Sequence, residues 1–273
     1  MTAPSAEHLL AVDTATAWQS VALLRGEQVS ALAEQDAAGS HARSLMGAID
    51  RVLGETGLRL TDLQGLAVSI GPGSFTGLRV GLATMLGFRA VLGTSIIPVP
   101  TLEAMAWNLR DVEGLLIPVI KSRHNEVYWA AYEWQPGQGL RTHLAEQVGS
   151  PSSVARACKG VTGVTLFGDG WQAYGQEIRQ AAEAMGVTVR EVDADCQRPS
   201  AVSVGLAARL RLATGQVGEE ALVPRYVQRT EAEVKFDELQ GVSALERRRE
   251  RVAKKLAQRK TGGRTGRDSR AKS

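Results

Sequence analysis

Seven residues in the first third of the chain, Gly71-Pro72-Gly73-Ser74-Phe75-Thr76-Gly77, have the types and spacing of a loop that binds a ligand or packs tightly. They join a strand-like run over residues 66–70 to a helix-like run over residues 78–88. The three glycines permit positive φ angles or a close backbone approach, and the two hydroxyl side chains suit a helix cap. Amides at a helix start can also hold an anion. Phosphate binding and tight helix entry are therefore both open.

The loop does not match the common phosphate and nucleophile motifs. A P-loop ends in Gly-Lys-Ser/Thr, whereas Leu78-Arg79 follow here. No acidic residue ends a strand about 20 residues on, as a dinucleotide site requires, and Pro72 stands where a nucleophile elbow has its first glycine. If the loop does bind phosphate, the candidate residues are Gly71, Gly73, Ser74 and Thr76.

Asp13 is the acidic residue most suited to join such a site. It ends the first predicted strand, where a buried carboxylate must be paired, hydrogen-bonded or turned toward a cleft. In two-lobed ATPases an acid at this place faces the phosphates and their metal. Structural hydrogen bonds within a hairpin containing Thr14 and Thr16 are the alternative.

Metal and disulfide sites are not expected. The four histidines include no His-x-x-x-His pair, and no Cys-x-x-Cys is present. The two cysteines, Cys158 and Cys196, fit no disulfide framework, so we expect ordinary thiols in a reducing cytoplasm. The first eight residues lack the pattern of a signal peptide, and no apolar run approaches the roughly 20 residues that span a bilayer.

The positive charge is concentrated at one end of the chain. Residues 241–273 carry twelve Lys or Arg and three acidic residues, a net charge of +9, which leaves 20 basic and 26 acidic groups in the first 240 residues. The globular part is therefore mildly acidic. If the chain binds nucleic acid through its charge, we expect the tail to do so. The candidate residues there are Arg247, Arg248, Arg251, Lys254 and Lys255.

The order of predicted elements indicates a duplicated α/β fold. Three meandering strands open the chain, followed by helix, strand, helix, strand and helix up to about residue 110, and the same order starts again near Leu115. This predicts two lobes with mixed sheets covered by helices, as in actin-like ATPases (ribonuclease H-like) and sugar kinases. We expect lobes over 1–110 and 111–230, a last helix returning toward the first lobe, and a basic, partly helical to disordered tail over 231–273.

The helices predicted over 40–56 and 77–91 carry apolar residues on more than one face, which is more than one sheet requires. We interpret the surplus as a partner surface. The residues predicted to form it are His41, Leu45, Ile49, Val80, Leu82, Met85 and Leu86.

Several motifs closely resemble the bacterial TsaB family. They are residues 10–16 (Leu-Ala-Val-Asp-Thr-Ala-Thr), 40–45 (Ser-His-Ala-Arg-Ser-Leu) and the glycine loop with its flank through Gly81, with further matches at residues 100–104, 126–128 and 224–226. The resemblance covers roughly residues 8 to 229.

The resemblance implies a non-catalytic subunit of tRNA threonylcarbamoyladenosine synthesis. Such a subunit pairs through first-lobe helices with its catalytic paralogue TsaD, and the ATPase TsaE joins the complex, which modifies adenosine 37 of tRNAs that read codons beginning with A. The metal-binding His-x-x-x-His of the paralogue is absent, because Leu45 stands four residues after His41. The resemblance thus implies a cytoplasmic scaffold without its own cofactor, with ATP and metal on its partners, and a homodimer when alone.

Two features depart from the family pattern. Lys121-Ser122-Arg123 stands where an Asp-Ala-Arg-like sequence is usual, so a base replaces an acid, and the tail after about Gly241 exceeds the family's usual extent. The tail either contacts tRNA phosphates or only solubilises the chain. The rival function is an active nucleotide-dependent transferase or kinase that uses Asp13 and the glycine loop.

Overall fold

A computed structural model describes residues 8–110, 112–135, 137–215, 222–225 and 227. The tail predicted over 231–273, with its five candidate basic residues, lies outside these described residues. The strands are β1 (His8–Asp13), β2 (Trp18–Arg25), β3 (Gln28–Asp36), β4 (Gly65–Ser69), β5 (Ile96–Val99), β6 (Leu115–Lys121), β7 (Val127–Gln135), β8 (Gly139–Gly149), β9 (Gly163–Phe167) and β10 (Thr188–Arg190). The helices are α1 (His41–Thr56), η1 (Leu60–Asp62), α2 (Phe75–Leu92), α3 (Thr101–Trp107), η2 (Pro151–Cys158), α4 (Asp169–Glu183), η3 (Ala194–Gln197) and α5 (Ala201–Ala213), where η marks a 3-10 helix.

The strands form two five-stranded mixed sheets with the same topology. The first has the order β3-β2-β1-β4-β5 and the second the order β10-β9-β6-β7-β8. In each, three consecutive strands pair antiparallel and two more add in parallel beside the first of them. This repeat confirms the duplicated α/β fold predicted from the element order.

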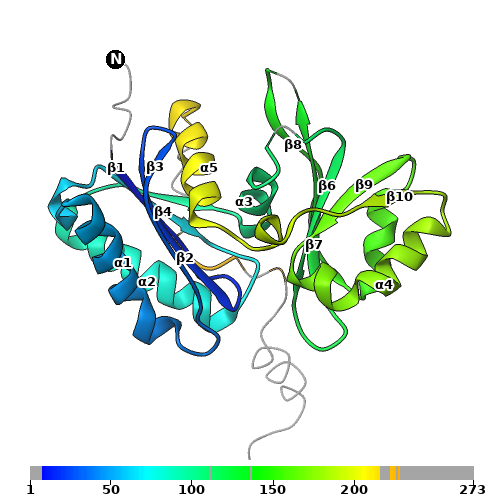
Figure 1. Ribbon diagram of the computed structural model, residues 1–273, viewed down its shortest axis with the longest axis horizontal. Coiled ribbons are helices and arrows are strands. Elements are labelled where there is room, and N and C mark those ends of the chain that lie inside the picture. Colours follow the sequence, from blue (N-terminus) through cyan, green and yellow to red (C-terminus); the bar gives the residue numbers. More distant parts are fainter. Residues whose placement is uncertain (1–7, 111, 136, 216–221, 226, 228–273) are drawn as a thin grey trace, which may run out of the picture. The chain divides into compact units, whose positions relative to one another are not determined.

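Each sheet is covered by helices because its strands are apolar on both faces. In β1, Leu10 and Val12 pack into the core under α1 and α2, while Leu9 and Ala11 pack into the core under α5. This alternation follows from the two-residue period of a strand. Figure 1 shows α1 and α2 on one face of the first sheet and α5 on the other.

The second sheet is built in the same way. Its strand β6 directs Ile117 and Val119 toward α4 and η2, and Leu116 and Ile120 toward α3. The helix α3 also packs against α5, which covers the first sheet. Consecutive residues of the central strands therefore supply separate cores, and α3 and α5 connect them.

Helix ends follow the sequence in some places and not in others. Ser74 caps α2, since its hydroxyl accepts a hydrogen bond from the amide of Gly77, and Gly57 ends α1 in the left-handed conformation. Thr101 and Asp169 stand at the starts of α3 and α4, but their side chains accept hydrogen bonds from the distant backbone amides of Gly71 and Lys121. The helix that starts at Pro151 is a 3-10 helix.

Candidate functional site

The glycine loop is packed against the turn between β1 and β2. A Cβ atom added to Gly73 would collide with the carbonyl oxygen of Ala15, and one added to Gly77 with that of Thr14. One turn further along α2, a Cβ on Gly81 would meet the hydroxyl of Thr14. The glycines therefore permit a close approach between two segments of the same chain.

Hydrogen bonds fix this contact. The amide of Ser74 donates to the carbonyl of Ala15 at 2.6 Å, and the hydroxyl of Thr14 donates to the carbonyl of Gly77 at 2.8 Å. The groups that face the loop's glycines are carbonyl oxygens, which would repel a phosphate. The loop in this conformation does not fit a phosphate between itself and the turn, so its geometry matches the packing alternative better.

The start of the loop is held by two other parts of the chain. Gly71 exchanges hydrogen bonds with Thr101 of α3, through the hydroxyl at 3.1 Å and the amide at 2.8 Å. Arg225 donates its amide to the carbonyl of Ile70 at 2.6 Å, and its own carbonyl would lie 2.7 Å from a Cβ on Gly71. A residue with a side chain at Gly71 would separate these contacts.

Arg225 also contacts the second sheet. Its guanidinium Nε lies 3.1 Å from the carboxylate of Glu146 in β8. Burial raises the pKa of Glu146 to about 7, and the neighbouring Arg225 only partly opposes this rise. Arg225 thus connects the start of the glycine loop with β8. Arg225 and Glu146 are 79 positions apart, so the periodicity of the sequence could not reveal their contact.

Asp13 is fully buried at the end of β1. Its Oδ1 accepts a hydrogen bond from the amide of Ala15 at 3.0 Å, and its Oδ2 has no partner among the described residues. Burial raises the pKa of Asp13 to about 6, although the Ala15 hydrogen bond favours the ionised form. The observed bond secures the β1–β2 turn, which is the structural role that the sequence left open.

In the second lobe the strand equivalent to β1 is β6, which ends at Lys121, and the nearby acid is Asp169 at the start of α4. It accepts a hydrogen bond from the amide of Lys121 at 2.8 Å, and the Lys121 ammonium lies 3.9 Å from its other oxygen. Burial raises the pKa of Asp169, while Lys121 acts in the opposite direction. No cluster of three or more His, Cys, Asp or Glu suited to a metal occurs in the part of the chain that the structure describes.

Most of the predicted partner residues on α1 and α2 are buried within this chain. Leu45, Ile49, Leu82 and Met85 are buried in the core under the first sheet, and His41 is buried with its Nε2 at 2.8 Å from the Thr16 carbonyl. The most regular apolar stripe of each helix covers the first sheet. Of the seven residues, Val80 is partly buried and Leu86 is 37% exposed.

The sequence reasoning missed most of the exposed apolar residues on these helices. Met46 of α1 is 45% exposed, and Val91 of α2 is 79% exposed. A Cβ on Gly47 or Gly87 would meet nothing within 4 Å, so both helices present open backbone beside these side chains. We call Met46, Gly47, Phe75, Leu86, Gly87 and Val91 the α1–α2 surface.

The apolar character of α2 has a further consequence. Among the described helices, α2 alone is long and apolar enough to cross a membrane by length and composition. Its buried residues pack on the first sheet and its other face belongs to the α1–α2 surface. Packing on the sheet accounts for the apolar residues of the buried face.

Comparison with known proteins agrees with this architecture. The family model "TsaD: tRNA N6-adenosine threonylcarbamoyltransferase" matches residues 32–236. The tRNA threonylcarbamoyladenosine biosynthesis protein TsaB of Haemophilus influenzae is 34% identical over 187 residues, which are 62% of this chain and 74% of that protein. The chain belongs to the TsaB family. TsaB of Escherichia coli is also 34% identical, over 61% of this chain and 73% of its own length.

A solved structure supports the TsaB assignment. YeaZ from Pseudomonas aeruginosa superimposes with a TM-score of 0.66 at 26% sequence identity, over 81% of this chain and all of that one. The 37% identity over 84 residues with the tRNA N6-adenosine threonylcarbamoyltransferase of Chelativorans covers 31% of this chain. This TsaB-family chain is thus also similar in sequence to the transferase.

Substituting two glycines of α2 tests whether the loop packs against the β1–β2 turn. We expect Gly77→Ala to lower the free energy of unfolding by about 3 kcal/mol, because the new methyl group meets a backbone carbonyl that cannot move freely. Gly87→Ala is the matched control, which should raise it by about 1 kcal/mol through helix propensity. Chemical denaturation measures both, and equal stability of the two variants would contradict the packing role.

Proposed function

We propose that this chain is a non-catalytic scaffold and activator subunit in the synthesis of N6-threonylcarbamoyladenosine at position 37 of tRNAs that read codons beginning with A. The observation that carries the proposal is its membership of the TsaB family together with the exposed apolar α1–α2 surface. A chain that assists a related catalytic subunit needs a surface for it, and this one has such a surface on helices that its own sheet does not fully bury.

The proposed partner is the TsaD-type catalytic paralogue. The α1–α2 surface combines apolar side chains with glycines that allow another helix to approach closely, as interfaces between packed helices require. Docking there would steady the paralogue's lobe and create a composite site for the ATPase TsaE. In the absence of the paralogue, a second copy of this chain would cover the same surface.

The contacts of the two acids Asp13 and Asp169 argue against a catalytic role for this chain. Asp13 forms no ion pair with a described residue and is bonded to the β1–β2 turn, and Asp169 is paired with Lys121. The rival nucleotide-dependent transferase or kinase requires these acids and the glycine loop to face a nucleotide. In this proposal ATP and metal are held by the partner subunits, and the chain works in the cytoplasm, where tRNA is modified.

The partner surface is tested by adding a charge to it. We expect Leu86→Asp to weaken binding of the purified chain to the TsaD-type paralogue by about a hundredfold or more, because the interface would bury an unpaired carboxylate. Isothermal titration or size-exclusion chromatography measures the loss. Leu86 is suited to this change because it is exposed, so the fold should tolerate the variant.

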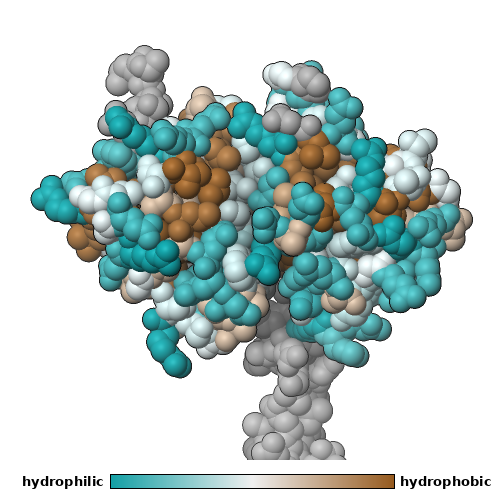
Figure 2. Space-filling view, viewed as in Figure 1, coloured by the Kyte–Doolittle hydropathy of each residue, from teal (hydrophilic) through white to brown (hydrophobic). Residues whose placement is uncertain are grey.

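Leu210→Asp on α5 is the matched control. Leu210 is 41% exposed, close to the 37% of Leu86, and Figure 2 shows hydrophobic side chains gathered over α5 as well. This variant should bind within about twofold of the wild type, since α5 is not part of the α1–α2 surface. A folded Leu86→Asp chain that binds as tightly as the control would refute the assignment.

We also propose that the basic tail contacts tRNA within the complex. Deleting residues 241–273 should flatten the salt dependence of tRNA association, because the tail's lysines and arginines would no longer release counterions from phosphates. A variant with Gln at Arg247, Arg248, Arg251, Lys254 and Lys255 separates charge from chain length. An unchanged slope of log K against log salt in both variants would contradict tRNA contact by the tail and leave it only a solubilising role.

A further inference from the structure

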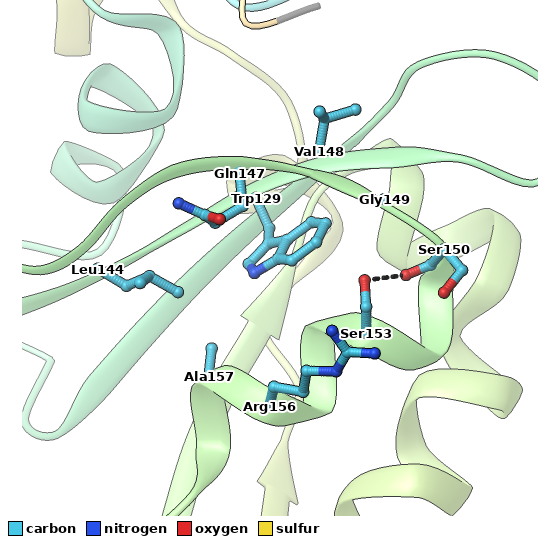
Figure 3. Close-up of a pocket in the computed structure, with 9 residues that line it drawn as sticks. All are labelled: Trp129, Leu144, Gln147, Val148, Gly149, Ser150, Ser153, Arg156 and Ala157. Carbon is cyan, nitrogen blue, oxygen red and sulfur yellow. Dashed lines mark hydrogen bonds between the residues drawn. The ribbon is translucent and has the colours of Figure 1, made fainter.

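The second lobe contains a pocket that the proposed function does not use. It lies between β7, β8 and η2, and its volume is about 430 Å³, within the range of small-ligand sites. Figure 3 shows its lining residues, which are Trp129, Leu144, Gln147, Val148, Gly149, Ser150, Ser153, Arg156 and Ala157.

The walls of this pocket are apolar on one side and carry donors on the other. Leu144, Ala157 and the ring of Trp129 supply the apolar contacts, and the guanidinium of Arg156 supplies a positive charge. None of the nine lining residues is acidic. A cation would find no counter-charge on these walls. An anion with a short apolar part would find both a positive charge and an apolar surface.

The indole of Trp129 is the second observation that points to a ligand. Trp129 is only 5% exposed, and its Nε1 has no hydrogen-bond partner among the described residues. A buried N–H group without an acceptor is costly and uncommon in folded proteins. Figure 3 shows the nitrogen edge of the ring turned toward the space between Leu144, Ala157 and Arg156.

The other polar groups of the pocket are already engaged. Ser153 donates its hydroxyl to the carbonyl of Ser150 at 2.5 Å, and Gln147 donates its amide nitrogen to the carbonyls of Ala145 and Glu146. The side chain of Arg156 forms no ion pair or hydrogen bond with a described residue, and because it is exposed it can rotate at the rim. The unused donors are therefore the Trp129 indole and the Arg156 guanidinium.

We propose that this pocket binds a small organic carboxylate with a compact apolar body. Its carboxylate would accept hydrogen bonds from Arg156 and from the Trp129 indole, and its apolar part would contact Leu144 and Ala157. One positive charge at the rim and one neutral donor match a monoanion better than a phosphate dianion. The site is made only from the second sheet and η2, so it does not depend on the α1–α2 surface.

The indole resonance of Trp129 gives a direct test in the full-length chain. Five tryptophans give five indole N–H signals in a nitrogen–proton correlation spectrum, and Trp129→Phe identifies the one from Trp129. Isobutyrate and benzoate are titrated at constant ionic strength, with isobutyramide as the uncharged comparison and inorganic phosphate as the dianion. We expect a saturable shift of the Trp129 signal with the carboxylates and little or none with the amide.

Two substitutions complete the test. Arg156→Gln should weaken carboxylate binding by about tenfold or more, because a charged hydrogen bond is lost, and Lys159→Gln is the matched control, an exposed cation just after η2 that does not line the pocket. The control should bind within about twofold of the wild type. No saturable shift with either carboxylate, or equal affinity in the Arg156→Gln chain, would overturn the proposal, and a stronger response to phosphate would overturn the choice of a carboxylate.

Discussion

The contact between the glycine loop and the β1–β2 turn is the constraint on which the first lobe depends. Because Gly73 and Gly77 lie against backbone carbonyls, α2 must start at one position and run across the sheet in one direction. That direction decides which of its residues are buried and which are exposed. On its other side the same loop contacts Thr101 of α3 and, separately, Arg225. A local packing requirement therefore positions segments that are far apart in the sequence.

This constraint also limits what the glycine loop can hold. Carbonyl oxygens of the turn occupy the side of the loop where a phosphate would need donors, and the Lys121 ammonium lies 3.9 Å from the carboxylate of Asp169. The two sheets have the same topology, and the polar residues near their strand ends bond to other residues of the same chain. The exposed faces of α1 and α2, and not the glycine loop, are then the part of the first lobe best suited to binding.

The sequence predicted the fold well because its signals are local. Alternating strands, helical periodicity and the Ser74 cap each depend on a few neighbouring residues, and all agree with the structure. The exposed apolar residues of α2 were harder to predict, since Met85 and Leu86 are adjacent and both apolar, yet Met85 is buried and Leu86 is exposed. Only the sheet beneath α2 separates them. The bonds between Arg225 and Glu146 and between Lys121 and Asp169 join distant residues, and no periodicity reports them.

In the proposed function this chain activates a related catalytic subunit and does no chemistry itself. The most direct measurement is the rate at which threonylcarbamoyladenosine forms on tRNA in a reconstituted reaction with the TsaD-type paralogue and the TsaE ATPase, as this chain is added in increasing amounts. The account predicts a rate that rises and saturates near one chain per paralogue, and no product from this chain alone. Product formation by the chain alone, or a rate that does not change when the chain is added, would contradict it.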